Sequence, residues 1–75
     1  MKELVEVIAK ALVENPDKVV VTEESNDKEV VVTLTVDPAD MGKVIGKNGR
    51  IAQSIRAVVK AAASKDSRKI NVKIM

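Results

Sequence analysis

Two of this chain's three glycines lie three positions apart in the segment V-I-G-K-N-G-R-I-A, residues 44–52. Apolar residues recur at helical spacing on both sides, so the sequence predicts a tight turn over residues 46–49 between two helices. Glycine adopts positive φ without strain, and it lacks the Cβ that would keep a ligand's backbone at a distance. A fold for this chain must therefore place two successive helices around a bare bend in the backbone.

One helix and two strands are expected before this turn. Apolar residues at helical spacing run from Leu4 to Leu12, and Asn15-Pro16 should end that helix at about residue 14. The β-branched segment 18–24 and the alternating segment 29–36 are typical of strands, and the Ser-Asn-Asp turn between them favours a hairpin. The residues that alternate onto the inner face of the second strand are Val30, Val32, Leu34 and Val36.

Two helices and a third strand are expected after residue 36. Asp37-Pro38 supplies a cap and a first helical residue for a short helix that reaches Ile45, and a longer helix begins near Arg50. A polar loop over residues 64–67 leads to an alternating strand over residues 68–75. The residues predicted to face inward are Ile55, Val59 and Ala62 on the helix and Ile70, Val72 and Ile74 on the strand.

These elements give the order α-β-β-α-α-β in a single domain that covers residues 1–75. The predicted class is α+β, with a three-stranded mixed sheet and all helices on one face, in two layers. The connection through the two helices is expected to be right-handed if the strands that it joins are parallel.

Composition argues against an enzyme, a metal site or a bound cofactor. The chain has no Cys and no His, which removes disulfides, thiolate ligands and the commonest general base. Charges interrupt every apolar run, so neither a signal peptide nor a membrane span is expected, and the protein should be cytoplasmic. The absence of Phe, Tyr and Trp leaves two interpretations, a family that tolerates an aliphatic core or a sequence simplified by design or reconstruction.

Charge is divided between the two halves of the chain. Residues 1–40 carry a net charge of −6, and residues 41–75 carry +8. Such asymmetry is a hint of nucleic-acid contact. The alternative is that the acidic half packs beside the basic half and neutralises it.

The glycine turn fails the two best-known phosphate motifs. The Walker A motif needs four residues between its glycines and Ser or Thr after its Lys, and the dinucleotide fingerprint needs a third glycine after a strand. What remains is a helix start, which favours phosphate, with the cations Lys47 and Arg50 beside it. The alternative is a helix–helix turn that needs glycine for its geometry only.

The pattern V-I-G-x-x-G-x-x-A-x-x-I, in this order of elements, resembles the KH domain. The fuller stretch M-G-K-V-I-G-K-N-G-R-I-A, the proline after the first helix and the length resemble the KhpA family of small stand-alone bacterial KH proteins, with a type II KH fold. The resemblance covers essentially the whole chain. It implies binding of about four nucleotides of single-stranded RNA through a GXXG loop.

The resemblance also implies roles for individual residues. Gly46, Lys47, Asn48 and Gly49 would meet phosphates, with Arg50 beside them. Val44, Ile45 and Ile55 would hold the two helices against the sheet. The second strand and the loop before the third strand would form the far wall of the base groove. The residues expected to border that groove are Gly42, Lys43, Ala52 and Arg56, where Ala52 is smaller than the aliphatic residue common in KH domains.

The implied biology is that of an RNA chaperone or post-transcriptional regulator that pairs with itself and with a KhpB-like KH protein and is linked to cell-wall synthesis and cell shape. Because aromatic stacking is absent, we expect weak, salt-sensitive binding led by phosphate contacts with little base preference. The alternative function is a protein-interaction module in which RNA is incidental. Ile51 and Val58 would then form a dimer patch, unless they are simply part of the core.

Overall fold

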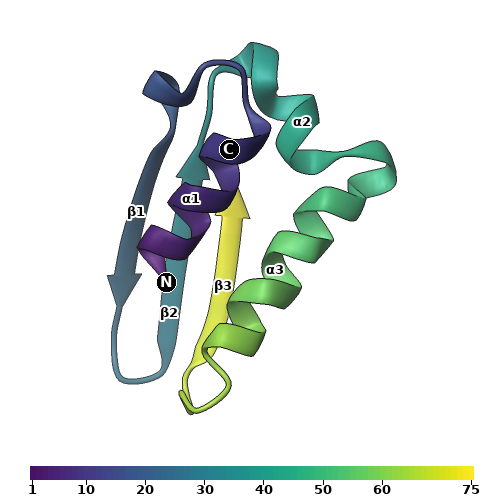
Figure 1. Ribbon diagram of the computed structural model, residues 1–75. Coiled ribbons are helices and arrows are strands. Elements are labelled where there is room, and N and C mark those ends of the chain that lie inside the picture. Colours follow the sequence, from purple (N-terminus) through teal and green to yellow (C-terminus); the bar gives the residue numbers. More distant parts are fainter.

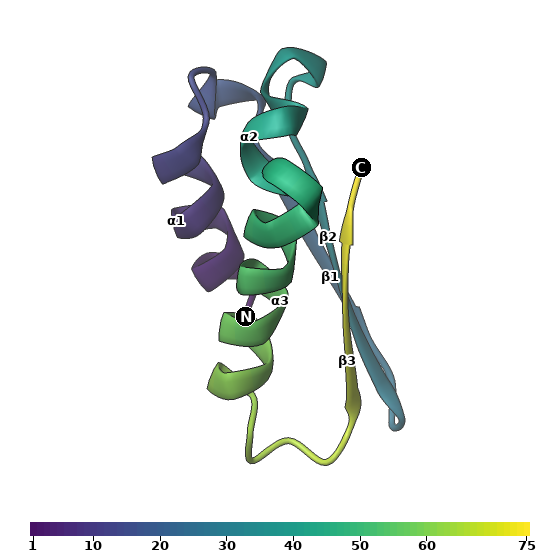
Figure 2. The same cartoon turned by 90° about the vertical axis from the view of Figure 1, so that its right-hand side faces the viewer.

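The computed structural model describes residues 1–75 as two layers, a sheet covered on one face by helices (Figures 1 and 2). This arrangement confirms the predicted α+β class and element order. Three short 3₁₀ turns, η1 to η3, interrupt the connections. The helices are α1 (Lys2–Leu12), α2 (Met41–Ile45) and α3 (Arg50–Ala62), the strands are β1 (Val20–Ser25), β2 (Glu29–Thr35) and β3 (Lys69–Ile74), and the turns are η1 (Pro16–Lys18), η2 (Pro38–Asp40) and η3 (Lys47–Gly49).

The sheet has the order β1-β2-β3 and is mixed. β1 pairs antiparallel with β2 through a hairpin, whereas β3 pairs parallel with β2. Val32 lies in the centre, opposite Glu23 on β1 and Val72 on β3. The parallel pair needs a long connection, and α2, η3 and α3 provide it.

The core is entirely aliphatic and is built around β2. Val30, Val32 and Leu34 on this strand are completely buried, and Val5 of α1 and Val59 of α3 pack in the same cluster. β-Branched side chains suit the pleated inner face of a sheet, so a valine-rich strand fills it without aromatic residues. The helices are therefore held against one central strand.

The end of α1 and the start of β1 differ from the sequence prediction. α1 ends at Leu12, two residues earlier than expected, and Val13 is already extended with φ −93° and ψ 158°. Lys18 lies in η1 and not in a strand, because Pro16 starts a 3₁₀ turn there and β1 begins only at Val20.

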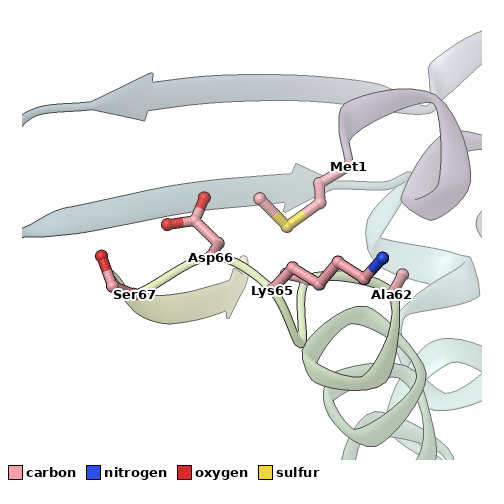
Figure 3. A pocket seen from close by; sticks show the side chains of 6 residues that line it. Met1, Ala62, Lys65, Asp66 and Ser67 are labelled. Atoms are coloured by element: carbon pink, nitrogen blue, oxygen red, sulfur yellow. The ribbon is translucent and has the colours of Figure 1, made fainter.

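Ala62 is exposed, contrary to the predicted inward face of α3. It lies on the last turn of the helix, where it lines a hollow of about 600 Å³ together with Met1 and the loop residues Lys65, Asp66 and Ser67 (Figure 3). The apolar spacing of α3 therefore continues past its last buried residue, Val59.

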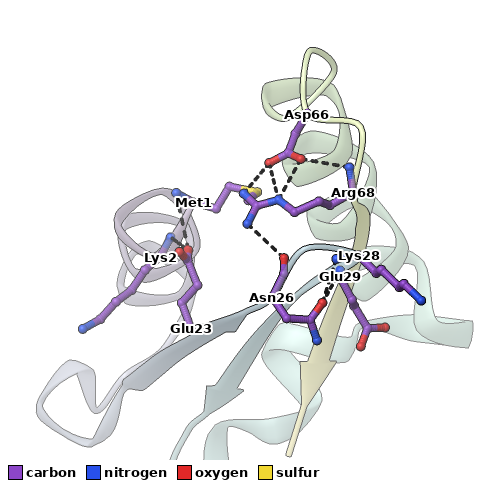
Figure 4. A network of polar contacts seen from close by, with 8 residues as sticks. All are labelled: Met1, Lys2, Glu23, Asn26, Lys28, Glu29, Asp66 and Arg68. Atoms are coloured by element: carbon purple, nitrogen blue, oxygen red, sulfur yellow. Dashed lines mark hydrogen bonds and ion pairs between the residues drawn. The ribbon is translucent and has the colours of Figure 1, made fainter.

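A polar network joins the loop before β3 to the turn of the β1–β2 hairpin (Figure 4). The Arg68 guanidinium donates to the Asp66 carboxylate, with Nη2 2.6 Å from Oδ2, and Nη1 donates to the carbonyl of Asn26 at 3.4 Å. The hydrogen bonds from Arg68 lower the pKa of Asp66 to about 2. The network links the start of β3 to the turn of the neighbouring β1–β2 hairpin.

Candidate nucleic-acid interface

The turn between α2 and α3 places three residues at positive φ, a region that L side chains avoid. Gly46 has φ 75° and ψ 175°, Asn48 has φ 58° and ψ 25°, and Gly49 has φ 74° and ψ 14°. Asn tolerates the left-handed region better than most residues, whereas the combination at Gly46 is essentially open to glycine alone. The residue types of the loop are those that its backbone requires.

The two glycines of the loop differ in their surroundings. A Cβ on Gly46 would lie 2.6 Å from Cγ1 of Ile51, whereas a Cβ on Gly49 would meet nothing within 4 Å. Gly46 is thus needed for packing as well as for backbone conformation. At this position the alternative of a helix–helix turn that needs glycine for its geometry is supported. Gly49 leaves open space in front of the backbone where α3 begins.

The start of α3 is electropositive and accessible. No side chain caps this end of the helix, which leaves its partial positive charge facing outward. Lys47, Asn48 and Arg50 are exposed, and neither cation makes an ion pair. Backbone N–H groups, a helix dipole and two free cations therefore converge on one turn, an arrangement that suits a phosphate.

Direct ion pairs between the two halves of the chain are few, which gives the alternative of mutual neutralisation little support. Among the cations after residue 40, only Lys43 pairs with an acidic residue from the first half, and Arg68 pairs with Asp66 in its own half. The cations of the second half that make no ion pair are Lys47, Arg50, Arg56, Lys60, Lys65, Lys69 and Lys73.

Lys43 is the exception among the predicted site residues. Its Nζ lies 2.6 Å from Oε1 of Glu14 and 3.8 Å from Oδ1 of Asp40, so the side chain is directed toward the end of α1. Asp40 is 1% exposed and accepts hydrogen bonds from the backbone N–H groups of Glu14 and Asn15 and from the Asn15 side chain. Burial opposes ionisation of Asp40, but these hydrogen bonds outweigh it and lower its pKa. Neither Glu14 nor Asp40 carried a sequence signal for this contact.

The remaining predicted groove residues lie in different settings. Gly42 is exposed with open space beside it, whereas Ala52 is buried at 5% exposure. Arg56 donates from Nε to the backbone carbonyl of Val72 on β3 at 3.2 Å. Gly42, Ala52 and Arg56 thus run from α2 along α3 toward the outer strand.

Two expectations about the groove are wrong. β2 is the central strand with a partner on each side, so its edges are not available as a groove wall, and β3 is the strand next to α3. Ile45 does not hold α2 against the sheet. Adjacent helical positions point about 100° apart, so Val44 is fully buried while Ile45 is 36% exposed.

Ile51 and Val58 lie on the opposite flank of α3, which faces α1. Ile51 is half-buried against the core, and Val58 is 45% exposed. Together with Ile8 and Leu12 of α1 they line an apolar groove of about 300 Å³. The core interpretation therefore holds for Ile51, and an exposed patch exists at Val58. The sequence did not predict that Ile8 and Leu12 line this groove, because their helical spacing is the same as that of the core residues of α1.

The structure contains no group of three or more Asp, Glu, His or Cys residues arranged to hold a metal ion. None of its helices has the length and apolar character that crossing a bilayer would require.

Comparison with known proteins decides the family. The family model described as KhpA/KhpB, KH domain, matches residues 2–74. The chain belongs to this family. The proteins named RNA-binding protein KhpA from Clostridium perfringens and from Caldanaerobacter subterraneus subsp. tengcongensis are each 56% identical to the chain over 75 residues, covering all of both sequences. The protein of the same name from Aquifex aeolicus is 48% identical, over all of this chain and 95% of its own length. No solved structure gives a significant match.

Membership of the KhpA/KhpB family confirms the resemblance drawn from the glycine turn and its flanks.

Proposed function

We propose that this protein binds single-stranded RNA through the GKNG loop, residues 46–49. The observation that carries the proposal is the accessible turn at the start of α3, with Lys47 and Arg50 unpaired and open space beside Gly49. Support also comes from relatives of equal length that are named RNA-binding proteins.

In this proposal the phosphate chain lies against the loop and the first turn of α3. Lys47 and Arg50 neutralise phosphates and release counterions, so affinity falls as salt rises. Since the chain has no aromatic residue for bases to stack on, phosphate contacts supply most of the binding free energy. A single module should bind weakly, and a second copy or a partner would raise the effective concentration.

The test is the double variant Lys47→Asp with Asn48→Asp, titrated with a short oligouridine RNA at two salt concentrations. We expect affinity to fall roughly tenfold or more and the salt slope to flatten by about 0.7 for each lost phosphate contact. The matched control is Ser64→Asp with Lys65→Asp, which makes the same charge change in the exposed loop that follows α3. A folded loop variant that binds RNA as tightly as the parent protein would falsify the proposal.

The broader role that fits this activity is an RNA chaperone or post-transcriptional regulator in the cytoplasm, working with a KhpB-like KH protein in cell-wall synthesis and cell-shape control. Small size and phosphate-led binding support a role in remodelling many RNAs over recognition of one. Annealing of two complementary RNAs, with the loop variant as the inactive control, measures the chaperone activity. Pull-down of the tagged protein, followed by footprinting of bound RNA and analysis of bound proteins, tests the partner and the targets.

A second candidate function is self-association through the apolar groove between α1 and α3. The observation that favours it is the exposure of Val58 beside Ile51, Ile8 and Leu12 in a continuous apolar surface. Val58→Asp should reduce the mass measured in solution, while Ala57→Asp, an adjacent exposed position, should leave it unchanged. If Val58→Asp changes the mass and the parent protein binds no RNA, protein interaction is the primary function.

A further inference from the structure

The face of the sheet that points away from the helices is uncovered (Figure 2). Successive side chains of a strand point to opposite faces, so the residues that alternate with the buried Val32 and Val72 lie on this open face. The register of the parallel pair places Lys73 of β3 beside Thr33 of β2, with Asn71 two residues before Lys73. Thr33 and Asn71 are half-buried and Lys73 is exposed. The open face thus presents polar side chains that the core does not use.

The charges of the open face differ between its two ends. At the hairpin end, the register partner of Lys69 is the acidic residue Glu29. At the other end, the register partner of Lys73 is Thr33, and the residue across β2 from it is Thr22, so its neighbours are neutral. Lys73 makes no ion pair. Of the two lysines that β3 presents on this face, Lys73 is therefore the one whose charge is available to an anion.

Lys73 also lies at the end of β3 that is nearer to the GKNG loop. α3 has 13 residues and starts at that loop, and β3 has six residues and runs back beside it (Figure 1). Both elements are roughly 20 Å long. The hydrogen bond from Arg56 to the Val72 carbonyl holds the middle of one against the middle of the other. The last residues of β3 are therefore level with the start of α3, and only the width of one strand separates the RNA loop from the open face.

The side chains around Lys73 suit the backbone of a nucleic acid. An ammonium group, a hydroxyl and an amide are all donors that proteins use toward phosphate oxygens. The chain has no aromatic residue, so this face gives bases nothing to stack on. A polyanion that is already bound at the loop is the occupant that this chemistry and this position favour.

We propose that the open face of the sheet around Lys73 is a second phosphate-contact surface, which holds the part of an RNA that extends beyond the loop. This inference rests on the proposed RNA binding through the GKNG loop. The loop takes about four nucleotides, and a longer strand crosses the edge of β3 and lies against Lys73, Thr33 and Asn71. These contacts are to the backbone, so they add affinity with length and do not select bases.

The experiment compares oligouridine RNAs of four and fifteen nucleotides, each titrated into dilute labelled protein so that an RNA strand holds one protein molecule. Lys73→Gln should weaken binding of the longer RNA about fivefold at 100 mM salt and flatten its salt slope by about 0.7, as expected for one phosphate contact. Binding of the tetranucleotide should not change. In NMR spectra of the parent protein, the backbone amide signals of Thr33, Asn71 and Lys73 should shift with the longer RNA and stay in place with the tetranucleotide.

The matched control is Lys69→Gln, which makes the same charge change on the same face of the same strand, beside Glu29. It should weaken the longer RNA by less than about twofold, because the neighbouring carboxylate already offsets this lysine. An equal loss in Lys69→Gln and Lys73→Gln would mean that net charge alone matters and would overturn the inference. Full affinity of Lys73→Gln for the longer RNA, or an equal loss for both RNAs, also overturns it.

The spectra of the parent protein test the inference without any variant. If the parent binds both RNAs and the three amide signals do not respond to the longer one, the inference is wrong and the proposed function stands. If the parent binds neither RNA, the proposed function fails as well. Signals that respond to a polyglutamate peptide and not to RNA would assign this face to an acidic protein partner. Signals that respond to protein concentration alone would assign it to a second copy of the chain. Either result overturns the inference.

Discussion

A turn precedes α3 and a loop follows it, and both lie in the basic half of the chain. Their conformations are fixed in different ways. At the start of α3, the turn to α2 is fixed by backbone conformation, with Gly46, Asn48 and Gly49 at positive φ. At its end, the loop to β3 is fixed by side chains, because Arg68 bonds both Asp66 and the carbonyl of Asn26 (Figure 4).

The difference decides which charges are available to a ligand. Backbone geometry forms the turn before α3, so the side chains of Lys47 and Arg50 are not needed to stabilise it and make no ion pair. Where a side-chain network makes the turn, the guanidinium of Arg68 is already used by the fold. A count of positive charges along the sequence does not separate these cases.

The largest expected effect is at the start of α3. Gly46→Ala should destabilise the protein by about 3 kcal/mol, because it adds a Cβ in a glycine-only conformation and because that Cβ would lie 2.6 Å from Ile51. Gly49→Ala, at similar φ but in open space, should cost about 1 kcal/mol. Urea unfolding monitored by circular dichroism measures both. Equal losses for the two variants would mean that packing against Ile51 adds nothing.

The next effect is at the other end. Arg68→Ala should lower the thermal unfolding midpoint. It removes the hydrogen bond from Arg68 to the Asn26 carbonyl and the hydrogen bonds from Arg68 to Asp66. RNA affinity of the folded variant should change by less than about twofold at 150 mM salt. Arg68 lies beyond the opposite end of α3 from the GKNG loop, so salt screens its charge there. A loss of affinity comparable to that of the Lys47 and Asn48 variant would break the comparison between the two ends.

The Asp66 carboxylate makes the far end sensitive to acid. Hydrogen bonds from Arg68 lower the pKa of Asp66 from 3.8 to about 2 in the folded state. A lowered carboxylate pKa stabilises the fold above the unfolded-state pKa, and the gain disappears as pH falls toward the folded-state value. The difference in unfolding midpoint between the parent and Asp66→Asn should therefore be constant above about pH 5 and shrink between pH 4 and pH 2. A difference that stays the same throughout that range would show that Asp66 acts without its charge.

The smallest effect concerns the one cation near the loop that is paired. Glu14→Gln should release Lys43 from its 2.6 Å ion pair and raise RNA affinity by no more than about twofold, since exposed pairs of this kind are weak. The salt slope of binding should steepen slightly if Lys43 then reaches a phosphate. Lower affinity in this variant would indicate that Glu14 positions Lys43 for RNA.

The sequence predicted the six main elements and their order because each carries a strong local signal. The alternation from Val30 to Val36 and the helical spacing from Arg50 onward need no knowledge of the rest of the fold. The glycine turn was also predictable, since its residue types follow from its backbone angles. The prediction of which side chains are buried was wrong in the shortest helix. α2 has only five residues, too few for periodicity to show that Val44 is buried and Ile45 is not.

Contacts between distant residues were outside the reach of the sequence. The pairing of Lys43 with Glu14 and the hydrogen bond of Arg56 to Val72 depend on how α1, α3 and β3 pack, and neither has a local pattern. The role expected for the second strand in the groove was wrong for the same reason. Strand order in space, and not order along the chain, decides which edge lies beside α3.

The parallel pairing of β2 with β3 has a consequence for synthesis of the protein in the cell. Residues 36 to 68 lie between these neighbouring strands, so their pairing closes a long loop and is expected to form late in folding. The ribosome must release residues up to 74 before the edge beside Arg56 exists. A nascent chain therefore displays the glycine turn, with Lys47 and Arg50 beside it, before the strand that packs against α3 has been made.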